Sequence, residues 1–212
     1  AGLDVVVQSG AGEASGFLDS AYAAKGARVA EEVIAQADVV LKVQPPTAEE
    51  IAMIKEEATL IGFLAPYTNI EGIRALAARK VTVFSMELMP RITRAQPMDA
   101  LSAMSTVSGY KAVLIAANRL PKFFPLLMTA AGTVSPARVF VIGAGVAGLQ
   151  AIGTAKRLGA VVEAYDTRPV VKEQVESLGA KFAELGLEAK DAQDKTGYAK
   201  AQSEDFYKKQ QE

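Results

Sequence analysis

The amino-acid sequence predicts an α/β protein in which two parallel-sheet domains are joined by a long helix. Short apolar runs alternate with helical patterns over residues 1–86, and this alternation is typical of parallel strands that are connected by helices. Residues 99–120 contain no proline and predict one helix that bridges the domains. A second strand-helix-strand pattern follows. The expected boundaries are residues 1–98 for the first domain, 99–136 for the linking helix and connection, and 137–212 for the second domain.

Four apolar runs in the first domain predict strands, and short helical patterns separate them. The strands are expected at residues 3–8, 37–43, 59–64 and 81–86, and the helices near residues 19–26, 31–37, 45–54 and 69–80. Thr47 precedes the third helix and Glu50 follows three residues later, which is the spacing of a capping box. The glycine-rich residues 9–16 lack the Gly-Lys-Ser/Thr ending of a phosphate-binding P-loop, so we interpret them as a plain loop.

The connection between the domains begins with a loop at residues 87–99, which contains two prolines and two arginines. Loops that follow strands in α/β sheets are where ligands are commonly met. Asp99 stands directly before the long helix and is expected to be its N-cap. After the helix, residues 123–137 predict a short packed segment and a turn.

The second domain opens with a glycine fingerprint. The apolar run VFVI leads directly into Gly143-x-Gly145-x-x-Gly148, and a helical pattern and another apolar run then lead to Asp166. Gly143 would allow the tight turn, Gly145 would let the backbone approach a pyrophosphate, and Gly148 would let the helix pack on the strand. The helix N-terminus would face the diphosphate, and Asp166 would accept from a ribose hydroxyl. These features predict a dinucleotide-binding domain in the second half of the chain. Together with the alternating strands and helices of the first domain, they lead us to expect that both parallel-sheet domains are Rossmann-like.

Both ends of the sequence are expected to be incomplete. The chain begins without methionine inside an apolar run, and only one strand-helix-strand unit of the second domain is clearly complete. Residues 169–182 repeat the helix-glycine-strand rhythm and predict a third strand, and residues 203–212 are polar and helical in pattern. The second domain is therefore expected to be truncated.

The composition limits the chemistry that this chain can perform. Its net charge of -1 does not favour nucleic acid as a partner. The absence of cysteine excludes disulfides and thiolate catalysis, and the absence of histidine excludes the usual general base and the commonest metal ligand. No uninterrupted apolar run reaches the roughly 18 residues of a membrane span, so the chain itself is expected to be soluble.

The sequence resembles the NAD(H)-binding component of proton-translocating nicotinamide nucleotide transhydrogenases. The matching stretches include MELMPRITRAQPMDALSAMSTVSGYKA, VIGAGVAGLQAIGTAKRLGA and YDTRPVVKEQVESLGAKF. The resemblance implies direct hydride transfer from NADH on this chain to NADP⁺ on an NADP(H)-binding partner component, coupled to proton movement by a membrane-spanning component. It also implies a homodimer at the cytoplasmic face of a bacterial inner membrane, or at the matrix side in mitochondria.

The resemblance also implies two groups of site residues. Gln96 can exchange hydrogen bonds with a nicotinamide carboxamide, while Arg91 and Asp99 are suited to hold one another and the loop. Ser102 and Tyr110 would help to line the nicotinamide pocket from the long helix. The residues expected around the rest of the cofactor are Gly143, Gly145, Val146, Ala147, Gly148, Asp166, Thr167, Arg168 and, in a loop that folds over bound nucleotide, Gly197 and Tyr198. No metal ligands are expected.

Two features bear on specificity. An acid at position 166 repels a 2′-phosphate, so NAD(H) should be preferred over NADP(H), although Arg168 two residues later could accommodate that phosphate. Pro97 stands where the family commonly has a small polar residue, and it removes one backbone donor from the loop.

Two alternatives remain. An alanine dehydrogenase would share this plan, but it needs a lysine and a histidine where this sequence has Gln44 and Ala65; Lys42 is present nearby. A non-catalytic NAD(H)-binding module is the other, and the loop from Arg91 to Asp99 argues against it, because a sensor has no need to present the nicotinamide to a partner.

Overall fold

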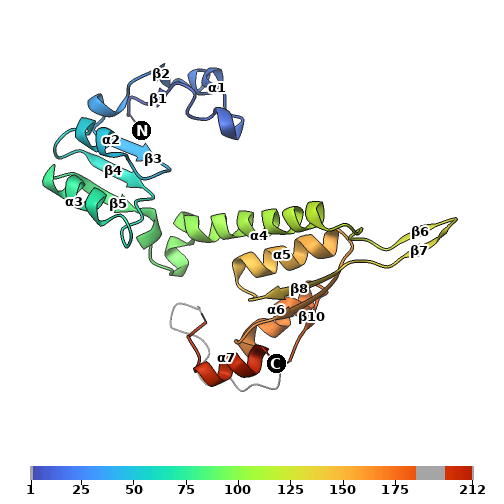
Figure 1. Ribbon diagram of the computed structural model, residues 1–212. Coiled ribbons are helices and arrows are strands. Elements are labelled where there is room, and N and C mark those ends of the chain that lie inside the picture. The colour runs from blue at the N-terminus through green and yellow to red at the C-terminus, as the bar shows by residue number, and fades with distance from the viewer. Residues whose placement is uncertain (1, 185–198, 212) are drawn as a thin grey trace. The chain divides into compact units, whose positions relative to one another are not determined.

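The chain divides into two compact units, Ala1–Met98 and Asp99–Glu212. The computed structural model describes residues 2–184 and 199–211, and Figure 1 shows the elements of each unit. Both units contain parallel strands connected by helices, which confirms the predicted α/β class.

The first unit is built on a three-stranded parallel sheet in the order β3-β4-β5. Its strands are β3 (Val39–Lys42), β4 (Thr59–Gly62) and β5 (Thr82–Ser85), and a separate parallel pair is formed by β1 (Val6–Gln8) and β2 (Arg28–Ala30). The helices are α1 (Asp19–Ala23), α2 (Ala48–Met53) and α3 (Ile70–Ala78). Leu60 on β4, Leu76 on α3 and Ile54 after α2 are fully buried in one core cluster, so the helices cover the sheet with their apolar faces.

The capping box predicted for α2 is confirmed. The Thr47 hydroxyl accepts from the Glu50 amide at 3.3 Å, and the Glu50 carboxylate accepts from the Thr47 amide at 2.7 Å. Two amides that lack partners inside the helix are thereby satisfied. The same Glu50 carboxylate accepts from Lys42 Nζ at 2.6 Å, which ties the start of α2 to the end of β3.

One expectation from the sequence is wrong and another is incomplete. Residues 31–37 do not form an α-helix: the chain forms β2 just before them and only a 3₁₀ turn at Ile34–Gln36. The sequence did not predict β2, which ends at Ala30, and a helix over the few residues that follow is too short to be stable by itself. Residues 123–137 contain the expected packed segment and turn, since Phe124 and Ala137 are buried in the core, but the sequence did not predict that the turn joins an antiparallel hairpin of β6 (Leu127–Thr129) and β7 (Gly132–Val134).

The second unit contains a three-stranded parallel sheet in the order β10-β9-β8. The strands are β8 (Arg138–Ile142), β9 (Val161–Tyr165) and β10 (Lys181–Phe182), and the helices are α4 (Ala100–Arg119), α5 (Val146–Arg157), α6 (Lys172–Ser177) and α7 (Glu204–Gln211). The third strand predicted after Asp166 is confirmed as β10. Ile152 and Ala155 of α5 are fully buried against Ala164 of β9 and Val175 of α6, so α5 is the central helix of this core.

The long helix predicted after residue 98 is confirmed as α4, and Asp99 caps it by accepting from the Ser102 amide at 2.9 Å. By length and composition alone, α4 could cross a membrane. In this unit, however, it packs along α5 so closely that a Cβ on Gly109 would lie 2.1 Å from the carbonyl oxygen of Ala147. The absence of a side chain at Gly109 therefore permits the contact.

Candidate functional site

The glycine fingerprint forms the turn between β8 and α5. Gly143 has a φ of +92°, which favours glycine, and its amide donates to the Tyr165 carbonyl at 2.7 Å. A Cβ on Gly148 would lie 1.8 Å from the Gly143 carbonyl oxygen, so only glycine allows α5 to pack at this point. A Cβ on Gly145 would have no neighbour within 4 Å, which leaves open space beside the N-cap of α5.

The N-terminus of α5 is suited to bind an anion. No side chain caps it and its first turn contains no acidic residue, although the helix leaves several backbone amides without an intrahelical acceptor. Gly145 is exposed, Val146 is exposed by 43%, and Ala147 is half-buried. A pyrophosphate at this helix end would accept from these amides and would be favoured by the helix dipole. The residues present therefore fit the diphosphate of a dinucleotide.

Asp166 lies at the end of β9 with its side chain only 5% exposed. Its Oδ2 accepts from the Ala144 amide at 2.7 Å and from Arg168 Nη2 at 2.9 Å, and its Oδ1 accepts from the Arg168 amide at 2.8 Å and from Arg168 Nε at 2.9 Å. Burial alone raises the pKa of Asp166, but these hydrogen bonds and the Arg168 charge outweigh it, so the pKa is lowered. The carboxylate is therefore charged at neutral pH and joins the glycine turn to β9.

This arrangement revises the expectation for Asp166. A carboxylate has about four lone-pair sites, and the Ala144 amide together with the Arg168 donors already uses that number. A ribose hydroxyl would have to share these sites or displace the guanidinium. Thr167 lies between Asp166 and Arg168 in the sequence and is half-buried. The contribution of the Ala144 backbone amide is not visible in the sequence, because a backbone donor carries no residue signature.

The residues expected around the nicotinamide fall in two places. Arg91 and Gln96 are exposed on the loop of the first unit, Gln96 within a 3₁₀ segment at Thr93–Met98 whose buried residue is Ala95. Asp99 and Ser102 come together in the second unit, where the Ser102 hydroxyl donates to Asp99 Oδ2 at 2.7 Å.

Of the remaining residues of the expected site, the structure describes some and not others. Tyr110 lies two turns further along α4 and is half exposed. Gly197 and Tyr198 lie outside the described residues. Pro97 lies inside the 3₁₀ segment with Gln96 and gives that segment no backbone donor.

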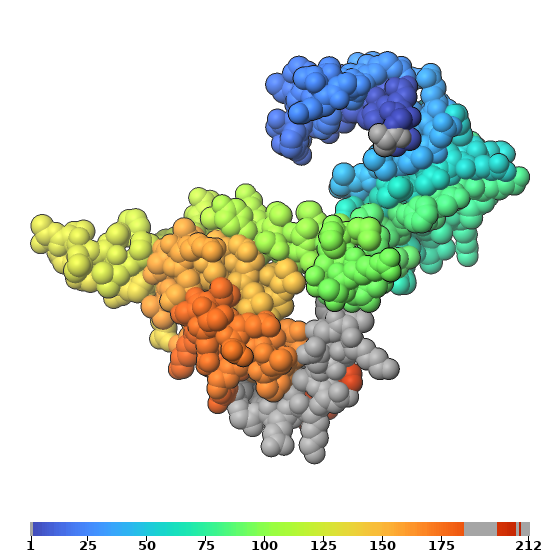
Figure 2. Space-filling view, turned by 180° about the vertical axis from the view of Figure 1, so that it is seen from behind, coloured from blue at the N-terminus to red at the C-terminus, as the bar shows by residue number. Residues whose placement is uncertain are grey.

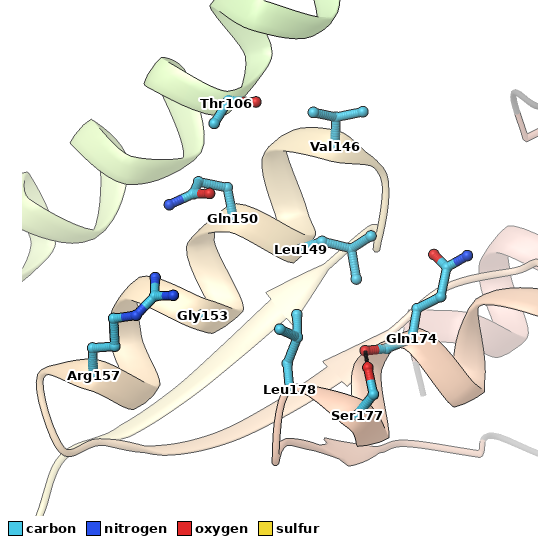
Figure 3. Close-up of a pocket in the computed structure, with 9 residues that line it drawn as sticks. All are labelled: Thr106, Val146, Leu149, Gln150, Gly153, Arg157, Gln174, Ser177 and Leu178. Carbon is cyan, nitrogen blue, oxygen red and sulfur yellow. Dashed lines mark hydrogen bonds between the residues drawn. The ribbon is translucent and has the colours of Figure 1, made fainter. Parts of the chain in front are cut away.

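A groove of about 420 Å³ runs along the outer side of α5 (Figure 3). Its lining residues are Thr106 from α4, Val146, Leu149, Gln150, Gly153 and Arg157 from α5, and Gln174, Ser177 and Leu178 from the region of α6. Among the expected cofactor residues that the structure describes, Val146 alone lines it. This groove is therefore not centred on the glycine turn.

The chain is similar to known proteins along nearly its whole length. Residues 1–108 match the alanine dehydrogenase/PNT N-terminal domain, and residues 112–211 match the alanine dehydrogenase/PNT C-terminal domain. An NAD(P) transhydrogenase alpha-subunit protein from Rhodospirillum rubrum is 54% identical, over 100% of this chain and 57% of that protein. The crystal structure of transhydrogenase from Sinorhizobium meliloti superposes with a TM-score of 0.83 and 54% identity, over 87% of this chain and 56% of that chain.

A more distant relative is alanine dehydrogenase from Halomonas elongata, which is 36% identical over 78% of this chain and 46% of that protein. The chain thus spans about half the length of the curated relatives that it matches.

Proposed function

Because the chain belongs to the alanine dehydrogenase/PNT family, we propose that it is the NAD(H)-binding component of a proton-translocating transhydrogenase. In this role it would bind NADH, and the hydride would pass directly to NADP⁺ on an NADP(H)-binding partner. The observation that carries the proposal is the glycine turn at the uncapped N-terminus of α5, in a chain that is 54% identical to a transhydrogenase alpha subunit. Proton movement would belong to a membrane-spanning partner.

The residue inventory agrees with direct hydride transfer. The bound nicotinamides supply the hydride chemistry, so the protein has to orient them and exclude water rather than supply an acid or a base. A chain without histidine or cysteine meets this requirement. Gln96 would hold the carboxamide of the nicotinamide from the loop, and Ser102 and Tyr110 would line the ring pocket from α4.

The Asp166–Arg168 pair supports a preference for NAD(H). The Asp166 carboxylate has only acceptor oxygens, so it would give a 2′-phosphate no donor. The Arg168 guanidinium is held side-on by the same carboxylate, so its positive charge is already balanced. Both features argue for NAD(H) on this chain and NADP(H) on the partner.

The β6–β7 hairpin supports a homodimer. It projects from the second unit (Figures 1 and 2) and exposes apolar side chains, among them Met128 at 79%. Apolar side chains gathered on a projecting element are typical of a surface that another chain covers. We place the assembly at the cytoplasmic face of a bacterial inner membrane, or at the matrix side in mitochondria.

The alanine dehydrogenase alternative is disfavoured by the first unit. Gln44 and Ala65 occupy the positions where that reaction needs a lysine and a histidine. Lys42 is present, but it pairs with Glu50 at 2.6 Å and so serves the capping box of α2. Without that lysine and histidine, oxidation of an amino acid lacks the proton acceptor that the reaction needs.

The proposal is tested by titrating the full-length protein with NADH and NADPH, and then adding the NADP(H)-binding component with an NADP⁺ analogue. We expect tighter binding of NADH, and hydride transfer only after the partner is added. Oxidation of alanine with NAD⁺ alone would instead support the alanine dehydrogenase. Nucleotide binding without either reaction would support a non-catalytic module.

A further inference from the structure

Glu87 is the first residue of the loop that carries Arg91 and Gln96, and its carboxylate binds three donors. Its Oε1 accepts from the amides of Leu64 at 2.9 Å and Ala65 at 2.7 Å, and its Oε2 accepts from the Ser85 hydroxyl. Leu64 and Ala65 follow β4, whereas Ser85 ends β5. One side chain thus joins the carboxyl ends of two neighbouring parallel strands, whose last residues Gly62 and Ser85 are opposite one another.

The backbone of the turn after β4, which donates to Glu87, is arranged to bind an anion. Ala65 has a φ of +49°, in the left-handed region that residues other than glycine rarely adopt. Just before it, the two consecutive amides of Leu64 and Ala65 converge on a single oxygen, as the amides of backbone nests do when they bind anions. The Ala65 carbonyl also accepts from the amides of Thr68 and Asn69 at 3.0 and 2.8 Å. The turn after β4 is therefore ordered on both sides, with Glu87 as its anion.

The charge state of Glu87 agrees with this geometry. Burial raises the pKa of its carboxyl, but the hydrogen bonds from Ser85, Ala65 and Leu64 outweigh burial and lower the pKa. A carboxylate that is charged and accepts several hydrogen bonds is a stronger anchor than a neutral side chain.

Within the loop, the backbone hydrogen bonds near Glu87 join residues that are close in sequence. The Met89 amide donates to the Met86 carbonyl at 3.3 Å, and the Ala95 amide donates to the Ile92 carbonyl at 2.9 Å. Ile92 is exposed, as are Arg91 and Gln96. By contrast, the bonds from Leu64 and Ala65 to Glu87 join residues that are 23 and 22 positions apart. They connect the start of the loop to the sheet.

We propose that Glu87 is a positioning residue for hydride transfer: it fixes the start of the loop to the turn after β4, so that Arg91 and Gln96 are presented in one geometry. This inference rests on the proposed function, because it assigns the loop a role in orienting the nicotinamide. Glu87 itself does not contact the reacting atoms. A positioning role makes it relevant to the rate of transfer and not to the affinity for NADH, which the glycine turn of the other unit would determine.

The test uses Glu87→Ala and Glu87→Gln in the full-length protein with its NADP(H)-binding partner. Glu50→Ala is the matched control, since Glu50 is another partly buried carboxylate that accepts from a lysine and a backbone amide in the same unit. Three quantities are measured: the NADH dissociation constant, the transfer rate at saturating nucleotides, and the rate of trypsin cleavage after Arg91 and Arg94. Cleavage after Arg79, on α3's C-terminal side, reports general unfolding.

For Glu87→Ala we expect a transfer rate lowered by about 10- to 100-fold, which is the effect of misplacing a positioning group by roughly 1 Å. Cleavage within the loop should accelerate without faster cleavage after Arg79. The affinity for NADH should stay within about twofold, because the position of the nicotinamide ring affects the transition state of hydride transfer more than it affects the binding of NADH. Glu87→Gln keeps an oxygen for the two amides and should recover some of the rate; it also replaces the alanine variant if that one does not fold. Glu50→Ala should change neither loop cleavage nor transfer.

Unchanged loop cleavage in both Glu87 variants overturns the inference, as does a transfer rate equal to that of the unsubstituted protein. Absence of transfer in the unsubstituted protein with its partner overturns the proposed function instead, and with it any catalytic role for the loop. The two failures are therefore distinguishable.

Discussion

Replacing Asp166 with asparagine removes a charge from a side chain that joins several segments of the second unit. The asparagine keeps one oxygen as an acceptor and presents an NH₂ group in place of the other, which accepts either from the Ala144 amide and Arg168 Nη2 or from the Arg168 amide and Arg168 Nε. In either orientation two donors lose their acceptor, and one of them belongs to the guanidinium. The Arg168 side chain is only 12% exposed, so water can replace the lost partner only in part.

The expected cost follows from this burial. Removing one partner of a buried ion pair destabilises a protein by roughly 3–5 kcal/mol. Because asparagine retains one acceptor and Arg168 keeps some solvent contact, we expect the free energy of unfolding of the second unit to fall by about 2–4 kcal/mol. The matched control is Glu163→Gln, which breaks the Arg138–Glu163 pair; Arg138 is 79% exposed, so the control should cost less than about 1 kcal/mol.

Hydrogen exchange of the amides in β8, β9 and α5 measures the stability of this unit separately from the first. The loss should depend on pH. The pKa of Asp166 is lowered in the folded protein, so its contribution is complete above the unfolded value of about 3.9 and is lost as the pH falls through the folded pKa. The difference between the protein and its variant should therefore shrink in acid. A loss no larger than that of Glu163→Gln would mean that the Asp166–Arg168 pair does not stabilise the second unit.

Other substitutions test the remaining elements of the account. Asp166→Asn should also weaken NAD(H) binding and narrow its preference over NADP(H), and an unchanged preference in titrations would count against the ribose contact. Gln96→Ala should slow hydride transfer with only a modest loss of NADH affinity; a large affinity loss with normal transfer would mean that its role is misassigned. Gly109→Ala should destabilise the second unit by about 1–3 kcal/mol through overpacking, detectable as faster exchange in α4. Thr47→Ala should cost the first unit about 1 kcal/mol by removing a cap, and an unchanged urea midpoint would show that the cap is redundant.

Local sequence patterns were sufficient where short-range physics decides the structure. The capping box of Thr47 and Glu50, the Asp99 N-cap of α4 and the strand that follows α6 are confirmed, because each depends on residues within a few positions of one another. The same reasoning failed at residues 31–37, where only a 3₁₀ turn forms, and it missed β2 just before them. It also missed the β6–β7 hairpin, in which no alternation of apolar and polar residues marks the strands.

The candidate site divides in the same way. The glycine spacing and Asp166 at the end of the second strand can be recognised in the sequence, because both belong to one strand-helix-strand unit. Glu87 carried no such signal, because its partners Leu64 and Ala65 donate through their backbones from another strand end. An acidic residue directly after a strand and before a proline-containing loop is the pattern that could have indicated it.

The parallel α/β plan, the order of most elements and the glycine turn follow from the sequence alone, because hydrophobic periodicity and glycine conformation act over short distances. The partners of the two buried carboxylates depend on the tertiary fold: Asp166 accepts from Ala144 and Arg168, and Glu87 accepts from the turn after β4. Three of these contacts join backbone amides to carboxylates 22 or 23 residues away. They exist because parallel strands bring their carboxyl ends together at one edge of a sheet, where buried polar groups must find partners.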